Sequence, residues 1–164
     1  MYLESGMLFD EGNSYRIEES GAYKAVSGYM RVVDFLQITT KSILFIEAKT
    51  TFPNPKNADS VERFREQIFR IYEKFLHSFN LLLALKTGCL SVTNFNIPSA
   101  YLGFEEKPVI FVLVIRNHEE VWCDAVRLAL LEVIPKYIIR LWKVRVIVLS
   151  SRGALNKGLV VGLG

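Results

Sequence analysis

Residues 32–57 read VVDFLQITTKSILFIEAKTTFPNPKN, and this stretch predicts the centre of the fold. Ile43–Ala48 is a nearly continuous apolar run, which is typical of a central strand buried on both faces of a sheet. Thr39–Ser42 is short and polar, and we expect it to form the turn of a β-hairpin. Thr50–Asn57 contains two prolines, so it must be a loop that continues neither a strand nor a helix.

The flanking sequence predicts strands before this stretch and a long helix after it. Tyr15–Glu19 alternates well enough for a short strand, and Ala22–Ile38 is rich in β-branched and aromatic residues, which predicts one long or bulged strand. Asp59 or Ser60 is a suitable N-cap for the helix, and Gly88 is a natural stop. An apolar stripe runs along this helix for about seven turns of 3.6 residues. Its members are Val61, Phe64, Ile68, Ile71, Tyr72, Phe75, Phe79, Leu82 and Leu83.

The rest of the chain predicts a loop with some local structure, a buried strand, a helix that a proline interrupts, a last strand and a loop-like tail. In that order, the segments are Ser91–Lys107, Pro108–Ile115, Glu119–Ile134 followed by Pro135, Val144–Leu149, and the tail from Ser150. Strands and helices in this order are typical of an α/β fold, with a mixed β-sheet flanked by helices. No repeat or linker divides the chain, so we expect a single domain over residues 1–164.

The composition favours a folded protein of the cytoplasm. Hydrophobic residues make up 51% of the 164 residues and charged residues 23%, which is enough apolar material for a core. The first twelve residues carry acids and no base, so we expect no signal peptide, and no apolar run approaches the roughly 20 residues that span a bilayer. Cys89 and Cys123 match no metal-ligand spacing and are expected to be free thiols in a reducing compartment.

Two carboxylates and a lysine are expected to meet at one edge of the sheet. Glu47 and Lys49 are two residues apart on the predicted central strand, so their side chains share a face, roughly 7 Å apart. If Thr39–Ser42 closes a hairpin, Asp34 returns beside them. Carboxylate and carbonyl oxygens are the ligands that Mg²⁺ prefers, so Asp34, Glu47 and the Ala48 carbonyl form a candidate metal site. Lys49 would orient water or offset charge on a phosphate.

Asp34, twelve intervening residues and Glu47-Ala48-Lys49 resemble the motif of the PD-(D/E)xK nuclease superfamily, which has the restriction-endonuclease-like fold. The resemblance covers roughly residues 15–116, including the order of strands and helix, and is closest to small stand-alone members. The aspartate here follows Val33 where the family pattern has a proline. The resemblance implies a restriction-endonuclease-like core and a magnesium-dependent nuclease, with Mn²⁺ as a substitute, that hydrolyses phosphodiester bonds, most often in DNA.

The resemblance also assigns roles to individual residues. Asp34 and Glu47 become metal ligands, and Lys49 becomes the catalytic lysine. Members often add an upstream glutamate, for which Glu18 is our choice and Glu19 and Glu4 are alternatives. Some members place a glutamine and a tyrosine on the helix after the lysine. Gln67 is carried over, whereas Tyr72 stands five residues later, where the family spacing is four.

A basic region near the end of the chain is a candidate contact for nucleic acid. After Glu132 the chain contains bases and no acid, and Lys136, Arg140 and Lys143 would form one stripe if Pro135 opens a helix. Such a stripe can neutralise phosphates, or it can be a solvated helix face. The same two interpretations apply to the stripe of Arg63, Arg70 and Lys74 on the long helix.

Two functions from different classes fit these observations. The first is an enzyme, a magnesium-dependent endo- or exodeoxyribonuclease, with an RNA substrate left open. The second is a non-catalytic module that binds nucleic acid or protein on the same fold. The resemblance also implies a homodimer, since cutting two strands requires two sites, and the aromatic loop Phe95–Phe104 is a candidate interface.

Overall fold

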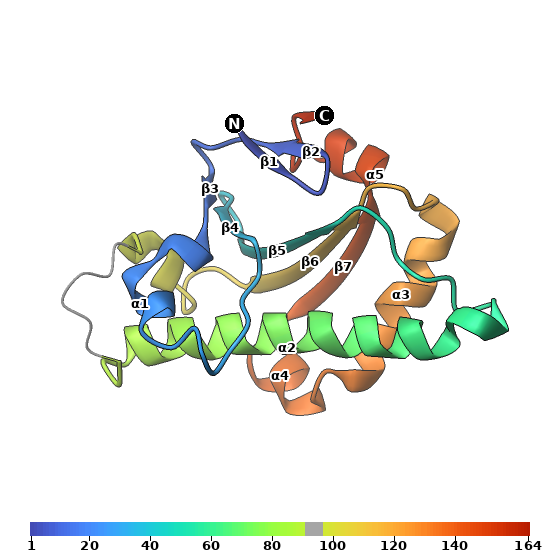
Figure 1. The fold of residues 1–164 in the computed structure, drawn as a ribbon. Helices are drawn as coiled ribbons and strands as arrows, with labels where there is room; N and C mark the ends of the chain where they lie inside the picture. The colour runs from blue at the N-terminus through green and yellow to red at the C-terminus, as the bar shows by residue number, and fades with distance from the viewer. Residues whose placement is uncertain (91–96) are drawn as a thin grey trace.

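A computed structural model describes residues 1–90 and 97–164, and its centre is a five-stranded mixed sheet (Figure 1). The strand order is β3-β4-β5-β6-β7, in which β3 and β4 run antiparallel to their neighbours while β5, β6 and β7 are parallel to one another. The bounds are Ser14–Tyr15 for β3, Phe35–Ile38 for β4, Ile43–Lys49 for β5, Val109–Ile115 for β6 and Arg145–Ser150 for β7. The predicted α/β fold, a mixed sheet flanked by helices, is confirmed.

The predicted hairpin joins β4 to β5. Phe35 pairs with Ile46 and Ile38 with Ile43, which sets the antiparallel register. The Thr39 side chain closes the turn, because its hydroxyl oxygen accepts hydrogen bonds from the N–H groups of Lys41 and Ser42. β5 lies between β4 and β6, and its residues from Ile43 to Ala48 are buried, so the expectation of a central buried strand is also confirmed.

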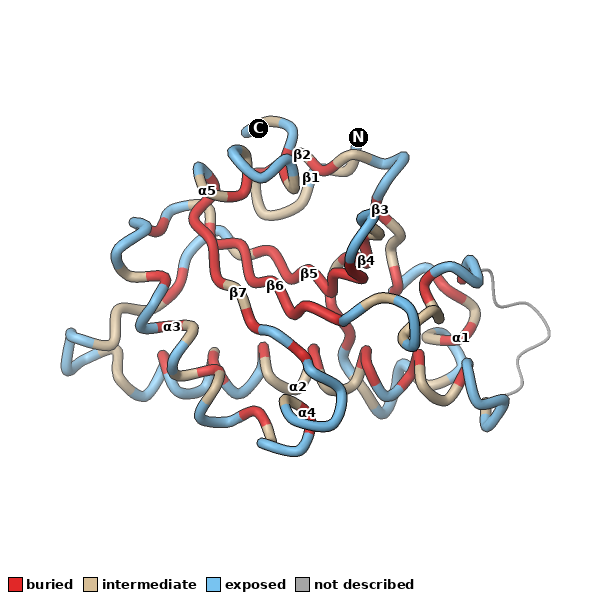
Figure 2. The backbone as a smooth tube through the Cα atoms, turned by 180° about the vertical axis from the view of Figure 1, so that it is seen from behind, coloured by how far each residue is buried: buried red, intermediate tan, exposed pale blue. Residues whose placement is uncertain are grey.

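Three helices cover one face of the sheet. These are α2 (Val61–Lys86), α3 (Glu120–Val133) and α4 (Lys136–Leu141), close to the predicted bounds, and Pro135 separates the last two. Phe75 of α2 stacks on Phe111 of β6 with ring centroids 4.7 Å apart, and Phe45 of β5 joins the same cluster. The red stretches of Figure 2 show that the sheet and the inner sides of these helices form the core.

The two ends of the chain cover the opposite face of the sheet. β1 (Tyr2–Glu4), β2 (Met7–Phe9) and β8 (Gly162–Leu163) form a small antiparallel sheet, and α5 (Ser151–Asn156) lies beside it (Figure 1). The expected loop-like tail from Ser150 was therefore wrong. The Ser150 hydroxyl caps α5 by accepting the N–H of Gly153, and β8 is held by pairing with distant β2, which local sequence does not reveal.

The predicted strands before residue 34 were also wrong. Tyr15–Glu19 contributes only its first residue to β3 and continues as a 3₁₀ helix, η1 (Ile17–Glu19), and Ala22–Ile38 is extended only from Phe35. Ser20 caps α1 (Gly21–Lys24) by accepting the N–H of Tyr23, and this local cap prevails over β propensity. The chain then reaches Asp34 as an irregular segment.

Two short 3₁₀ helices flank α2. η2 (Ala58–Ser60) leads into it, and the Ser60 hydroxyl donates back to the carbonyls of Asn54 and Asn57 instead of capping α2. η3 (Ser99–Leu102) follows residues 91–96, so the beginning of the predicted interface loop lies outside the described residues. In the described remainder, Pro98, Ser99 and Ala100 are exposed, but Tyr101 is buried against Tyr15, so this aromatic side chain is not on the surface as we expected.

Among the described residues, none of the helices is both long and apolar enough to cross a membrane.

α2 holds the segment that precedes Asp34. The N–H of Val33 donates to the hydroxyl of Ser78 at 2.9 Å, and the N–H of Arg31 donates to Nδ1 of His77 at 3.1 Å. Ser78 is completely buried, so its hydroxyl replaces the strand partner that the Val33 amide lacks.

We expect Ser78→Ala to destabilise the protein by about 1–3 kcal/mol, because it leaves the buried Val33 amide without an acceptor. Urea unfolding measures this change, with Ser27→Ala as the control because the Ser27 side chain is exposed. Equal unfolding midpoints for the two variants would contradict the role given to Ser78.

Candidate functional site

The strand β5 runs to Lys49, but its pairing with β4 ends at Ile46. The edge of β5 that faces β4 therefore has no strand partner at Ala48. Because Phe35 pairs with Ile46, Asp34 lies just beyond the last paired residue of β4. The Asp34 Oδ2 atom accepts the N–H of Ala48 at 2.8 Å, and the Ala48 carbonyl accepts the hydroxyl of Ser5 at 3.0 Å. The N–H and C=O of one strand residue point to the same side, so the Asp34 carboxylate and the Ala48 carbonyl share this edge.

Glu47 lies on the face of β5 that α2 covers. It lies on the same face of the strand as Ile43 and Phe45, which pack in the core beneath α2, and it is completely buried. The carboxylate contacts two ammonium groups. Lys49 Nζ lies 2.7 Å from Oε1, and Lys74 Nζ lies 2.8 Å from Oε1 and 2.9 Å from Oε2.

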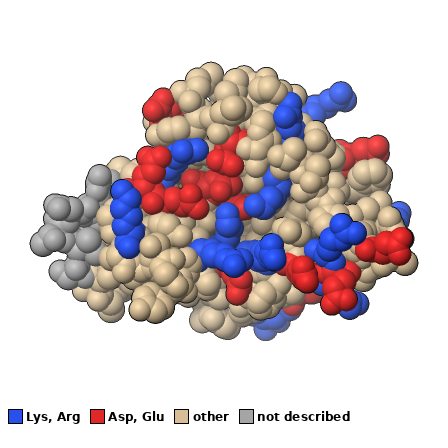
Figure 3. All heavy atoms as spheres, viewed as in Figure 1, with Lys and Arg blue, Asp and Glu red and all other residues tan. Residues whose placement is uncertain are grey.

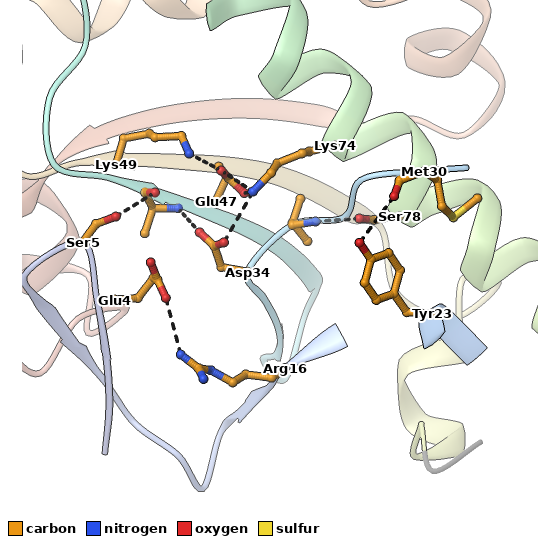
Figure 4. A network of polar contacts seen from close by, with 12 residues as sticks. Glu4, Ser5, Arg16, Tyr23, Met30, Asp34, Glu47, Lys49, Lys74 and Ser78 are labelled. Atoms are coloured by element: carbon orange, nitrogen blue, oxygen red, sulfur yellow. Dashed lines mark hydrogen bonds and ion pairs between the residues drawn. The ribbon is translucent and has the colours of Figure 1, made fainter. Parts of the chain in front are cut away.

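Lys74 joins the two carboxylates. Its Nζ atom lies 3.5 Å from Oδ1 of Asp34 as well as within hydrogen-bond distance of Glu47, so Asp34 and Glu47 face one shared point (Figure 4). Two carboxylates and two lysines therefore form one cluster at the end of β5. The formal charges of these four groups cancel when all are ionised.

The electrostatic environment of this cluster is dominated by burial. Burial and the neighbouring Asp34 carboxylate raise the pKa of Glu47 to about 7, although Lys74 and Lys49 oppose the shift. Burial also disfavours the charged form of Lys74, but the carboxylates of Glu47 and Asp34 prevail and raise its pKa. Lys74 is therefore held as an ammonium, whereas Glu47 titrates near neutral pH.

The expected residues Asp34, Glu47, Ala48 and Lys49 thus come together. Lys74 was expected only as part of a basic stripe on the long helix, and its place between the two carboxylates was missed, although the sequence holds a signal for it. It stands between Ile71 and Phe75, which are both buried, at the border of the apolar side of α2, and a charged residue there requires a partner.

The upstream glutamates differ in position. Glu18, our first choice, lies exposed on η1, while Glu4 of β1 is partly buried beside Asp34 (Figure 4). Burial and the charge of Asp34 raise the pKa of Glu4, and Arg16 opposes this from 3.4 Å away. The Glu18 charge contributes to the field at both Glu4 and Lys74. Glu4, which was an alternative to Glu18, therefore lies beside Asp34, whereas Glu18 remains exposed.

A cleft of about 870 Å³ opens beside the cluster, between α2 and the loop after β5. Gln67 lines it, as the resemblance implied, whereas Tyr72 packs against the core and Phe69. Lys136, Arg140 and Lys143 are exposed but lie far from the cluster in the topology. The predicted stripe is wrong for Lys143, because α4 ends at Leu141 and Lys143 has a positive φ of 52°, so the helix carries only Lys136 and Arg140. These residues precede the start of β7, whereas Lys49 ends the parallel strand β5, so they lie towards opposite ends of the sheet.

The donor atoms fit a divalent cation in part. Among residues 1–90 and 97–164, no group of three or more His, Cys, Asp and Glu side chains is arranged to hold a metal ion. The oxygens of Asp34 and Glu47 nevertheless converge on a cation, the Lys74 ammonium, and the Ala48 carbonyl lies on the same open edge as Asp34. Hard cations accept such oxygens and complete their shell with water, so the set fits Mg²⁺ provided that Lys74 moves.

When compared with family models, with characterised proteins and with solved structures, the chain matches none of them.

The raised pKa of Glu47 makes stability depend on pH. Between its ordinary value of 4.5 and about 7, the folded protein keeps a proton on Glu47 that the unfolded chain has lost. The stabilisation from this proton is complete below 4.5 and is lost as the pH rises through about 7.

The variant Glu47→Gln cannot titrate at this position. We therefore expect its unfolding free energy to increase relative to that of the wild type as the pH is raised from about 5 to about 8. Urea unfolding at each pH measures this difference, and Glu62→Gln, at an exposed position on α2, should follow the wild type. Parallel curves for the wild type and Glu47→Gln would show that Glu47 does not titrate in this range.

Proposed function

We propose that this chain is a divalent-metal-dependent nuclease that hydrolyses phosphodiester bonds, and the resemblance described above favours DNA as its substrate. The observation that carries the proposal is the convergence of Asp34 and Glu47 on one cation position beside Lys49, at the wall of a cleft lined by basic side chains. In this proposal the chain is a member of the PD-(D/E)xK superfamily, with Mg²⁺ as its metal and Mn²⁺ as a substitute.

Each residue then has a defined task. Asp34, Glu47 and the Ala48 carbonyl would hold the metal, which supplies positive charge that polarises a phosphoryl oxygen and lowers the pKa of a nearby water. Lys49 donates hydrogen bonds that orient the water or offset the charge that builds on the phosphate. The water oxygen bonds to phosphorus as the ester bond breaks, giving a phosphate monoester and an alcohol. Gln67, on the cleft wall, positions the strand.

Lys74 supports a second candidate function. Its ammonium group already balances the two carboxylates, so the cluster is neutral without a metal. A buried ion pair of this kind can serve structure alone. In this alternative the chain is a non-catalytic module, and the cleft binds nucleic acid or protein without cutting.

Cleavage assays with single-stranded, double-stranded and branched DNA, and with RNA, in Mg²⁺ or Mn²⁺ test the first candidate. We expect Lys49→Ala to slow cleavage by about 10²–10³-fold, as does the loss of one preorganised donor in other enzymes. Lys41→Ala, in the turn at the other end of the hairpin, is the matched control and should retain full activity. No cleavage by the wild type, or equal cleavage by Lys49→Ala, rejects the nuclease.

Calorimetry with Mn²⁺ separates the two candidates without an activity assay. At about pH 8, where Glu47 is mostly ionised, we expect binding that Asp34→Asn and Glu47→Gln abolish. Lys74→Met should bind Mn²⁺ more tightly, by about tenfold or more, because it removes the ammonium that occupies the metal position. Lys86→Met, on the same helix but paired with Glu105, should match the wild type. Absence of binding by both the wild type and Lys74→Met favours the module.

A further inference from the structure

The cleft is lined by a regular stripe of α2. Arg63, Gln67, Arg70 and Lys74 follow one another at steps of four, three and four residues, so they lie on one side of the helix. At 1.5 Å per residue, Arg63 and Lys74 are about 16.5 Å apart along the helix axis. In Figure 3, blue side chains gather along this part of α2, next to a red group of acids.

The arginines of the cleft lack carboxylate partners. Among the described residues, Arg31, Arg63 and Arg70 form no ion pair, whereas Arg16 and Arg127 do, with glutamates and an aspartate. Glu47 is the acid that lines the cleft, and its charge is already matched by two lysines. The positive charge of these arginines therefore remains available to an anion.

The opposite wall adds neutral hydrogen-bond donors. Asn54 and Asn57 lie on the loop after β5, and each accepts a backbone N–H through its Oδ1 atom. This leaves their Nδ2 amino groups, which can only donate, without a partner among the described residues. Thr50 and Thr51 also line this wall. Guanidinium groups on one side and amide or hydroxyl groups on the other are the usual contacts of phosphate and sugar oxygens.

We propose that this cleft binds the sugar–phosphate backbone of a nucleic-acid strand along α2, through Arg63 and Arg70, without reading the base sequence. Measured along a duplex axis, on which one strand rises about 3.4 Å per nucleotide, the stripe from Arg63 to Lys74 covers the rise of about five nucleotides. The charges of Asp34 and Glu18 both act on Glu4, which lies beside Asp34, and the acids Glu4 and Glu18 repel phosphates, so the backbone is steered towards α2.

This inference deepens the proposed function by giving the substrate a path, but it concerns binding and needs no catalysis. It also selects between the two basic surfaces of the chain. The surface of Lys136 and Arg140 on α4 lies towards the other end of the sheet, and Lys136 donates a hydrogen bond to the carbonyl of Leu131. In our proposal that surface is a solvated helix face.

Fluorescence anisotropy with labelled oligonucleotides tests the path, in EDTA so that nothing is cut. The double variants Arg63→Gln/Arg70→Gln and Lys136→Gln/Arg140→Gln remove the same charge from the two surfaces. Affinity is measured between about 50 and 200 mM salt, where each phosphate contact adds about 0.7–0.9 to the slope of log K against log salt. Circular dichroism melts establish that both variants fold.

We expect the arginine pair to lower the slope by about 1.4–1.8 and to weaken binding at least tenfold, while the Lys136/Arg140 pair leaves both unchanged. Single-stranded and duplex probes show which form supplies the backbone, and two probes of unrelated sequence should bind within about twofold of each other. An unchanged slope for the arginine pair, an equal loss for the other pair, or strong sequence dependence overturns the inference.

Lys49→Ala distinguishes failure of this inference from failure of the nuclease. Because Lys49 is held by Glu47 and is one of several cations in the cleft, Lys49→Ala should keep most of the binding while losing cleavage. Binding that depends on the arginines, together with a wild type that cuts nothing, would uphold the path and reject the nuclease. Cleavage by the wild type, together with binding that does not depend on the arginines, would uphold the nuclease and reject the path.

Discussion

The buried carboxylate of Glu47 is the constraint on which the rest of the site depends. An isolated charge at a completely buried position would be strongly disfavoured, so it must be paired or protonated. The structure provides both routes, since two ammonium groups contact the carboxylate and its pKa is raised to about 7. The helix α2 has to pack with Lys74 facing β5. Asp34 has to lie just outside β4, where its carboxylate contacts the same ammonium. The packing of the long helix and the electrostatics of the site are therefore one requirement.

The parts of the fold that were predictable are those in which local pattern and tertiary environment agree. β5 and β6 are apolar because both faces are buried, and α2 shows helical periodicity because one side packs on the sheet. The errors lie where distant partners or short caps decide the structure. Ala22–Ile38 has the composition of a strand, but Ser20 caps a helix there and Ser78 of α2 takes the Val33 amide. The small sheet of β1, β2 and β8 depends on pairing between the two ends of the chain.

The candidate site divides in the same way. Asp34, Glu47 and Lys49 were predictable because a hairpin register and a two-residue strand period bring them together. Lys74 comes from an element 25 residues later in sequence than Lys49, so only packing could show that it occupies the point between the carboxylates. Glu4 lies beside Asp34 because the terminal sheet places it there, and no local pattern predicts that sheet. Local sequence therefore does not predict the Lys74 ammonium, which neutralises the two carboxylates, or the Glu4 carboxyl group beside Asp34.

The occupant of one cation position, between Asp34 and Glu47, thus decides between the two functions considered for this chain. If the ammonium of Lys74 holds that position permanently, the cluster is a structural ion pair beside a basic cleft. If a divalent cation can displace it, Asp34, Glu47 and Lys49 become a hydrolytic centre, and Lys74 is released towards the cleft. A crystal soaked in Mn²⁺ at about pH 8 distinguishes the two by anomalous scattering. Our account predicts a peak between Asp34 and Glu47, with the Lys74 ammonium displaced from between them. A map without that peak, with Lys74 still bridging the two carboxylates, would contradict it.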